Sequence, residues 1–208
     1  NDFSKGQIIM EGVDTAIVGC PNVGKSTLMN LLSGTEKSIV TEIAGTTRDA
    51  VDSRFENEYG KYLFIDTAGI RRKSKVDDRI EKFSVMRAQM AIDRADVCLI
   101  MIDAREGVTE QDTKVAGMAH EAGKACIIVV NKWDAVKKND KTMKEYTEKI
   151  RKNFLFMDFA PIVFVSALNN ERVHTLLDKV LVVYENINRH VNTSVLNDVL
   201  MDAIIINQ

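Results

Sequence analysis

Gly19-Cys20-Pro21-Asn22-Val23-Gly24-Lys25-Ser26 is the stretch that decides the fold, because it matches the phosphate-loop pattern G-x-x-x-x-G-K-[ST]. An apolar run typical of a buried strand, Thr15–Val18, precedes it, and an apolar pattern of helical spacing, Thr27–Leu32, follows it. Strand, glycine loop and helix together predict a phosphate cradle made of backbone N–H groups at a helix start. A glycine turn that merely joins a strand to a helix is the alternative. In the cradle, Lys25 would reach the β- and γ-phosphates and the Ser26 hydroxyl would bind Mg²⁺.

Composition and charge are those of an ordinary globular protein. The 208 residues are 45% hydrophobic and 28% charged, which suits one α/β domain and the beginning of another. A net charge of −2 gives no overall attraction to nucleic acid or to an anionic membrane, although a local patch remains compatible with RNA binding. No bilayer-length apolar stretch or signal peptide is visible, and the three cysteines (Cys20, Cys98 and Cys126) lack metal-ligand spacing. We therefore expect a cytoplasmic location, no membrane partner and no role for Cys20.

Strands and helices alternate along the chain, which predicts a mostly parallel sheet with helices on both faces, the α/β fold of P-loop NTPases. Strands are expected near 14–19, 50–55, 61–66, 97–102, 125–130 and 161–165, and helices near 25–33, 80–92, 111–122, 142–154 and 173–187. The polar segment 35–49 is interpreted as a loop. Ligands of such sheets bind beyond the carboxyl ends of the strands, and the motifs of this chain follow strands.

The tetrapeptide Asp66-Thr67-Ala68-Gly69 follows a predicted strand and is interpreted as a sensor of the γ-phosphate and its metal. The Asp66 carboxylate can hold Mg²⁺, usually through water, and the Gly69 N–H can donate to the γ-phosphate. Taken alone, the tetrapeptide would also make a good turn. Its place after a phosphate loop and a strand favours the metal-sensing interpretation.

The tetrapeptide Asn131-Lys132-Trp133-Asp134 is interpreted as the base-recognition loop. The two acceptors of the Asp134 carboxylate match guanine N1–H and N2–H₂ and match no edge of adenine. Asn131 is expected to bind the other edge of the base and to tie this loop to the phosphate loop, while the Lys132 stem covers the ring face. A polar loop at a strand end is the alternative when the motif is taken alone. Ser166-Ala167-Leu168 adds an Ala167 N–H for guanine O6.

In chain order, these motifs resemble those of the translation-factor class of GTPases. The stretch Ile43-Ala44-Gly45-Thr46-Thr47-Arg48-Asp49 narrows the resemblance to the TrmE–Era–EngA-like GTPase family, and further details are most similar to the second GTPase domain of the EngA (Der) group. These details are the Asn-Lys-Trp-Asp sequence, Arg71–Lys75, 120–124 and 193–198.

The resemblance implies a Ras-like G domain that hydrolyses GTP and in which Thr47 reaches Mg²⁺ when GTP is bound. It also implies a nucleotide-dependent switch in assembly of the large ribosomal subunit, with ribosomal RNA or a ribosomal subunit as partner. A tRNA-modification or other RNA-associated GTPase of the same group, and a nucleotide-gated binding module with incidental hydrolysis, are the alternatives.

The domain organisation is predicted as a lead-in at 1–13, a GTPase domain at 14–190 and a final helix at 191–208. Ser194 is expected to cap that helix, whose apolar face has no obvious partner within the GTPase domain. The resemblance implies that this helix opens a KH-like RNA-binding domain. We therefore expect the chain to be a fragment, and the isolated fragment to be a monomer.

Two departures from a Ras-type enzyme bear on mechanism. Ile70 stands where Ras-type enzymes carry the glutamine that orients the attacking water, and isoleucine cannot do this. The resemblance implies a potassium ion beside the phosphates, ligated in part by Asn22; the alternative is that Asn22 only stabilises the loop. The basic run Arg71–Lys75 is either a solvated face or an RNA-contacting patch that moves with the nucleotide state.

The predicted site divides into three sets of residues. Those expected to bind the nucleotide are Gly19, Pro21, Asn22, Val23, Gly24, Lys25, Ser26, Thr27, Asp66, Thr67, Ala68, Gly69, Asn131, Lys132, Asp134, Ser166, Ala167 and Leu168. Those expected to bind Mg²⁺ are Ser26, Thr47 and Asp66. Those expected to act in hydrolysis are Lys25, Thr47, Gly69 and Asn22.

Overall fold

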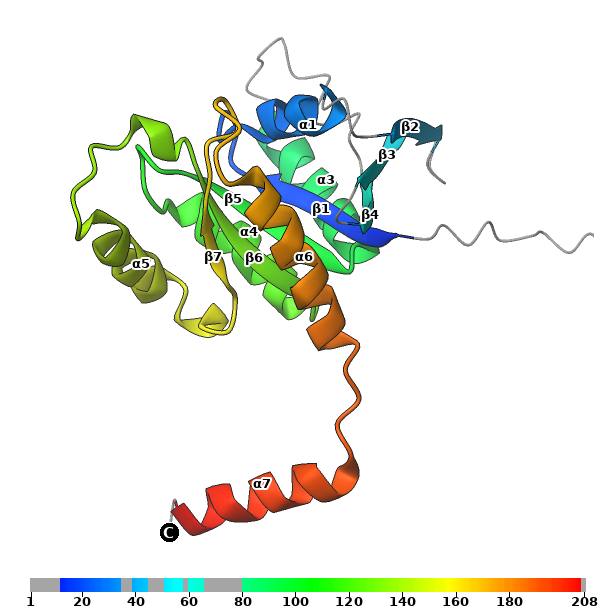
Figure 1. Ribbon diagram of the computed structural model, residues 1–208, viewed down its shortest axis with the longest axis vertical. Helices are drawn as coiled ribbons and strands as arrows, with labels where there is room; N and C mark the ends of the chain where they lie inside the picture. Colours follow the sequence, from blue (N-terminus) through cyan, green and yellow to red (C-terminus); the bar gives the residue numbers. More distant parts are fainter. Residues whose placement is uncertain (1–11, 35–38, 45–50, 58–59, 66–79, 207–208) are drawn as a thin grey trace, which may run out of the picture.

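The computed structural model describes residues 12–34, 39–44, 51–57, 60–65 and 80–206. Its elements are β1 (Val13–Gly19), α1 (Lys25–Gly34), β2 (Ile39–Ala44), β3 (Val51–Asn57), β4 (Gly60–Phe64), α3 (Ile80–Arg94), β5 (Val97–Asp103), α4 (Glu110–Glu121), β6 (Ala125–Asn131), η1 (Trp133–Ala135), α5 (Thr142–Asn153), η2 (Leu155–Met157), β7 (Ile162–Phe164), α6 (Val173–Ile187) and α7 (Thr193–Ile206). The strands form a central sheet with helices on both of its faces, as the sequence predicts (Figure 1).

The sheet has the strand order β2-β3-β4-β1-β5-β6-β7. Strands β4, β1, β5, β6 and β7 run parallel, whereas β3 is antiparallel to both β2 and β4. Every residue of β5 and β6 is buried, because these continuous apolar runs are covered by helices on both sides. The register pairs Gly19 with Met101 and Asp103 with Asn131, so β1, β5 and β6 end at one edge, where the phosphate loop follows β1 and the motif that starts at Asn131 follows β6.

Two apolar layers hold the helices against the sheet. On one face, α1 and α6 contribute buried residues such as Leu28 and Leu177 to a cluster with β1, β5 and β6. On the other face, α3, α4 and α5 contribute residues such as Ile92, Ala116 and Ile150. Burial of this apolar surface is the main favourable term in folding. The two layers therefore fix the sheet, and with it the edge where the motifs meet.

The segment predicted as a loop at 35–49 was interpreted wrongly in part. Residues 39–44 form β2, which pairs antiparallel with β3 from Ile39 opposite Glu56 to Ala44 opposite Val51. Ile39, Val40, Thr41 and Ile43 are β-branched, and this composition favours a strand. The short apolar run was overlooked because polar residues at 35–38 and 45–49 flank it.

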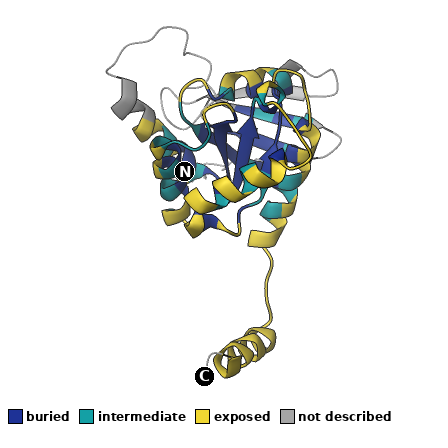
Figure 2. Cartoon of the chain, turned by 90° about the vertical axis from the view of Figure 1, so that its left-hand side faces the viewer, coloured by how far each residue is buried: buried dark blue, intermediate teal, exposed yellow. Residues whose placement is uncertain are grey.

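The last helix, α7, stands away from the body of the domain at the end of an extended connection (Figure 1). None of its residues is buried, and the helix is coloured as exposed in Figure 2. Its apolar side chains, such as Leu196, Val199 and Ile204, are exposed. The prediction that Ser194 caps the helix is wrong. Helix α7 begins at Thr193, and the carbonyl of Asn192 accepts the Leu196 N–H at 3.1 Å, so Asn192 stands at the cap and Ser194 in the first turn.

Among the described residues, no helix combines the length and the apolar character needed to cross a membrane.

Candidate nucleotide-binding site

The two glycines of the phosphate loop are required by its backbone. Gly19 has φ 142° and lies so close to β5 that a Cβ would be 2.4 Å from the Met101 carbonyl oxygen. Gly24 has φ 102°, and a Cβ there would be 2.1 Å from Asn131 Nδ2. Residues other than glycine rarely adopt such φ angles, and a Cβ atom cannot lie so close to another atom. The loop therefore owes its shape to residues on the neighbouring strands as well as to its own sequence.

The Lys25 side chain closes over the loop that precedes it. Its Nζ donates to the carbonyl oxygens of Gly19 at 2.6 Å and Cys20 at 2.5 Å. Helix α1 begins at Lys25, and its first turn is closed by the Leu28 N–H donating to Gly24 O at 2.9 Å. The ammonium and the partly positive helix start thus lie together, an arrangement that attracts phosphate. Ser26 and Thr27 are exposed in that first turn.

The remaining loop residues divide between core and surface. Val23 is buried and belongs to the cluster under α1 and α6, so it anchors the loop. Pro21 and Asn22 are exposed, and Asn22 adopts a left-handed conformation with φ 63°, which asparagine tolerates better than most residues. The Asn22 side chain is therefore presented to solvent at the tip of the loop.

Asn131, at the end of β6, ties three loops together. Its Nδ2 donates to Val23 O at 2.8 Å, and its Oδ1 accepts the Ala167 N–H at 2.9 Å. The side chain is only 2% exposed, so both bonds are made in the interior. The predicted tie between the base loop and the phosphate loop is confirmed. The Ala167 N–H, which was expected to donate to guanine O6, donates to Asn131 Oδ1 instead. Its role toward a base stays a prediction, and it would require the N–H to donate to both acceptors.

The Ser166–Leu168 turn brings a third strand end to the site. Ser166 is buried and exchanges two backbone hydrogen bonds with Glu171, at 3.0 and 3.1 Å, which closes the turn. Ala167 is buried beside Asn131, whereas Leu168 is 76% exposed at the rim. The structure thus gathers the phosphate loop, the base loop and this turn, as the sequence predicts.

The base loop is anchored by Trp133, which the sequence interpretation did not single out. Its ring is buried, with its centroid 4.5 Å from that of Phe164 and 5.2 Å from that of Tyr146. The backbone N–H of Trp133 donates to the backbone carbonyl of Val165 at 3.1 Å. The aromatic anchor holds the loop down, so that the residues on either side of Trp133 face the site.

The Asp134 carboxylate is half-buried, and its Oδ1 is buried without a hydrogen-bond partner among the described residues. A buried acceptor without a donor is costly, so this oxygen calls for a donor that the described residues do not supply. Guanine, with N1–H and N2–H₂ side by side, offers the donors that this carboxylate lacks.

Lys132 and Asp103 form an ion pair that the sequence interpretation missed. Lys132 Nζ lies 2.6 Å from Asp103 Oδ2 and donates to Asn22 O at 2.5 Å. Arg105 binds the same carboxylate through Nε at 3.1 Å and Nη2 at 2.7 Å. Burial raises the pKa of Asp103, but the hydrogen bonds from Arg105 and Lys132 outweigh it and hold the pKa well below its usual range. An aspartate ending an apolar strand was the available signal.

Several predicted residues lie outside the described part of the chain. These are Thr47, Asp66, Thr67, Ala68, Gly69, Ile70 and the basic run Arg71–Lys75. Their assignments to Mg²⁺, to the γ-phosphate and to RNA therefore stay predictions. Ser26 is the one predicted Mg²⁺ ligand among the residues that the structure describes.

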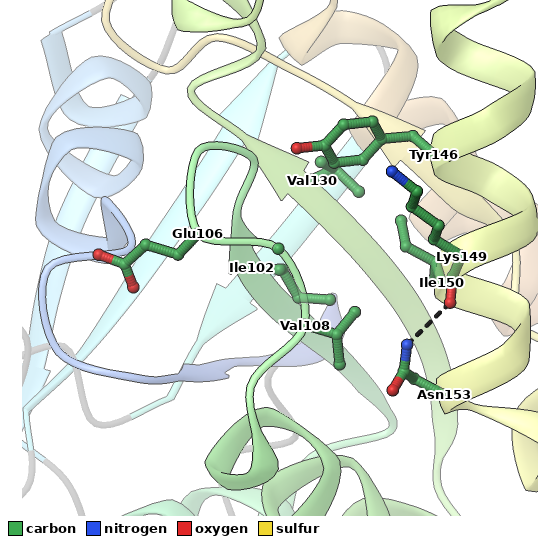
Figure 3. Close-up of a pocket in the computed structure, with 9 residues that line it drawn as sticks. Ile102, Glu106, Val108, Val130, Tyr146, Lys149, Ile150 and Asn153 are labelled. Atoms are coloured by element: carbon green, nitrogen blue, oxygen red, sulfur yellow. Dashed lines mark hydrogen bonds between the residues drawn. The ribbon is translucent and has the colours of Figure 1, made fainter.

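A separate pocket of about 280 Å³ lies behind the base loop, between α5 and the loop after β5 (Figure 3). Ile102 and Val130 form its apolar floor, and each directly precedes a residue of the site on its strand. Glu106 lines it from the loop after β5 and Lys149 from α5, and in Figure 3 the Glu106 side chain points away from the other lining residues. Among the described residues that line this pocket, none is a predicted nucleotide-binding residue.

Comparisons with known proteins agree with this geometry. A family model described as 50S ribosome-binding GTPase matches residues 14–132. The chain is 53% identical over 195 residues, 94% of its length, to the GTPase Der of Thermoanaerobacter sp. (strain X514), of which this match covers 44%. It is 55% identical over 191 residues, 92% of its length, to the GTPase Der of Geobacillus thermodenitrificans (strain NG80-2), again covering 44% of that protein.

Solved structures give the same result. A crystal structure of Era in complex with MgGDPNP and a segment of 16S ribosomal RNA matches with a TM-score of 0.63 and 35% identity, over 83% of this chain and 56% of the Era chain. The chain spans less than half of the length of the curated relatives described above.

Proposed function

The chain belongs to the 50S ribosome-binding GTPase family, and from this premise we propose that it binds GTP with Mg²⁺ and hydrolyses it to GDP and phosphate. The observation that carries the proposal is the unpartnered, buried Oδ1 of Asp134, in the loop that Asn131 and Lys132 bind to the phosphate loop. A site built around hydrogen bonds rejects an analogue that lacks them by about 10⁴-fold or more. Asp134 therefore selects guanine over adenine.

The phosphate loop and Lys25 hold the triphosphate. The Lys25 ammonium and the start of α1 offset the charge of the β- and γ-phosphates, and the loop glycines allow the backbone N–H groups to approach them. Ser26, in the exposed first turn of α1, is suitably placed to bind Mg²⁺ together with Thr47 and Asp66. The metal would supply neutralisation of charge on the β- and γ-oxygens. Gly69 would donate its N–H to the γ-phosphate.

Potassium is part of the proposal because Ile70 cannot orient water. Asn22 is exposed at the tip of the loop, where its amide oxygen is available to a monovalent cation beside the phosphates. A cation there would stabilise the charge that develops in the transition state, as an arginine finger does.

At the level of the cell, we propose a nucleotide-dependent switch in the assembly of the large ribosomal subunit. The family description and the GTPase Der relatives support this role, and the Era complex with 16S ribosomal RNA supports RNA as a partner. The exposed apolar face of α7 is compatible with a following KH-like domain that packs against it. The unpaired state of Cys20, Cys98 and Cys126 supports a reducing, cytoplasmic location.

The substitution Asp134→Asn tests the base site. It replaces one acceptor of the carboxylate with a donor, so preference should move from guanine toward xanthine, whose N2–H₂ is replaced by a carbonyl. GTP and XTP titrations of both proteins measure the change, and Asp140→Asn, an exposed substitution in the following loop, is the matched control. An unchanged preference for GTP in Asp134→Asn would remove Asp134 from the base site.

A further inference from the structure

Lys132 combines an unusual backbone conformation with two close contacts of its ammonium group. Its backbone is left-handed, with φ 61° and ψ 33°, which costs a residue other than glycine roughly 1–2 kcal/mol. The Nζ bridges two segments, because it donates to Asn22 O at 2.5 Å and pairs with Asp103 Oδ2 at 2.6 Å. The conformation matters to the site because Asp134 follows two residues later. Whatever holds Lys132 therefore sets the direction from which Asp134 meets the base.

The Asp103 carboxylate is the buried end of this bridge. Its side chain is 4% exposed, whereas the side chains of Lys132 and Arg105 are 25% and 54% exposed. Oδ1 accepts the Arg105 N–H at 2.9 Å and Arg105 Nε at 3.1 Å, and Oδ2 accepts Arg105 Nη2 and Lys132 Nζ. Both cations hold the carboxylate in its charged form, with a pKa below the usual range. Arg105 saturates the outer side of the carboxylate, and Lys132 binds the side toward the phosphate loop.

The corner that carries Asp103 is itself fixed from several directions. The Ala104 N–H donates to Asn131 O at 2.9 Å, and the Gly107 N–H donates to Asp103 O at 3.0 Å. The Tyr146 hydroxyl, which stands at the edge of the pocket in Figure 3, donates to Ala104 O. Strand β5, helix α5 and the base loop thus hold the carboxylate in place.

We propose that Asp103 is a positioning residue for the guanine nucleotide: through Lys132 it fixes the base loop against the phosphate loop at Asn22. The contacts of the Asp103 carboxylate are with Arg105 and Lys132, so its effect on the nucleotide passes through Lys132. Asp103 acts by holding the Lys132 ammonium, which would otherwise be free to turn to solvent and release the Asn22 carbonyl. This inference rests on the proposed function, because it assigns a role within the same nucleotide site.

If Asp103 has this role, its loss should change nucleotide binding in a specific way. The contacts of Asp103 concern the base loop and the tip of the phosphate loop, which meet GDP and GTP alike. Loss of the Asp103 charge should therefore lower the affinities for GDP and GTP by the same factor, mainly by raising the dissociation rates. Turnover at saturating GTP, measured in NaCl so that the potassium ion proposed at Asn22 does not contribute, should be unchanged, because an interaction made equally in ground and transition states alters KM and not kcat.

The test uses Asp103→Asn, which keeps the size of the side chain and removes its charge. We expect Kd for GDP and for GTP to rise about tenfold, as the loss of one charge-assisted hydrogen bond implies, with kcat in NaCl unchanged. The control is Arg105→Ala, which removes the exposed partner of the same carboxylate and leaves the Lys132 pair; it should change Kd by less than about threefold. Both dissociation constants and dissociation rates can be followed with a fluorescent GDP analogue.

A double-substitution cycle separates positioning from general destabilisation. Lys132→Met should weaken binding, and Asp103→Asn added to it should weaken binding little further, because the bridge is already lost. The double variant also removes both charges together, so it keeps the test available if Asp103→Asn alone does not fold.

Three results would overturn the inference: wild-type affinity in Asp103→Asn, fully additive losses in the cycle, or a fall in kcat at unchanged Kd. A wild-type chain that does not bind GDP or GTP would overturn the proposed function and this inference together. Tight binding by the wild type with equal binding by Asp103→Asn would overturn this inference alone.

Discussion

Replacing Gly24 by alanine should damage the site chiefly by displacing Asn131. The added Cβ would lie 2.1 Å from Asn131 Nδ2 and 3.5 Å from Asn131 Cγ, and the nearest atoms within 4 Å belong to that one side chain. Asn131 is 2% exposed and makes hydrogen bonds of 2.8 and 2.9 Å, so it cannot give way without breaking them. The substitution also forces alanine to adopt φ 102°.

The magnitude follows from these contacts. Asn131→Ala leaves the Val23 carbonyl and the Ala167 N–H buried without a partner, which at about 1–2 kcal/mol each predicts a loss of about 2–4 kcal/mol of unfolding free energy. Gly24→Ala should lose the same two bonds and add about 1 kcal/mol of backbone strain, about 3–5 kcal/mol in all. In the double variant the clash is gone and only the strain is added, so its loss should also be about 3–5 kcal/mol.

Equilibrium unfolding of the nucleotide-free proteins in urea would measure the four free energies. The slope with denaturant should stay constant across the set, which would show that the variants unfold from the same compact state. Independent effects would instead sum to about 5–9 kcal/mol in the double variant. Additive losses of that size, or a Gly24→Ala protein as stable as the wild type, would refute the conclusion that the loop glycine is required by Asn131.

Two further predictions follow from the site. If a monovalent cation binds at Asn22, saturating GTP should be hydrolysed up to about 10²–10³-fold faster in KCl than in NaCl of equal ionic strength. Asn22→Ala should remove most of the difference. Equal rates in the two salts would refute the proposal that potassium compensates for the missing glutamine at position 70. Burial, and to a lesser extent the nearby Asp112, raises the pKa of the Cys20 thiol to about 11. Alkylation of Cys20 at neutral pH should therefore be about tenfold slower than that of a free thiol, and it should accelerate as pH rises. Cys98 and Cys126 are buried and should react only on unfolding, and mass spectrometry of the labelled native protein would detect any faster reaction.

Local sequence was sufficient for much of the fold. The continuous apolar runs predicted β5 and β6, and the predicted starts and ends of α1, α4 and α6 are close to those observed. Local patterns also identified the phosphate loop, because its glycines need conformations that a pattern of spacing can reveal. The edge strand β2 was missed because its short apolar run lies between polar segments. The cap of α7 was missed by two residues because asparagine and serine are both favoured there.

The contacts between motifs could not be predicted in the same way, because they depend on which strand ends lie side by side. Asn131 binds Val23, 108 residues earlier, and Ala167, 36 residues later, and nothing in the local sequence selects those two backbone groups. The role of Asp103 could not be predicted for the same reason. An aspartate that ends an apolar strand is also common in ordinary turns, and its partner Lys132 is 29 residues away. The strand order decides the matter, because β5 lies between β1 and β6 and so brings Asp103 next to both the phosphate loop and the base loop. If Asp103 acts as we propose, nucleotide affinity in this chain depends on a carboxylate that lies outside every recognisable motif, and substitutions chosen from motifs alone would not reveal it.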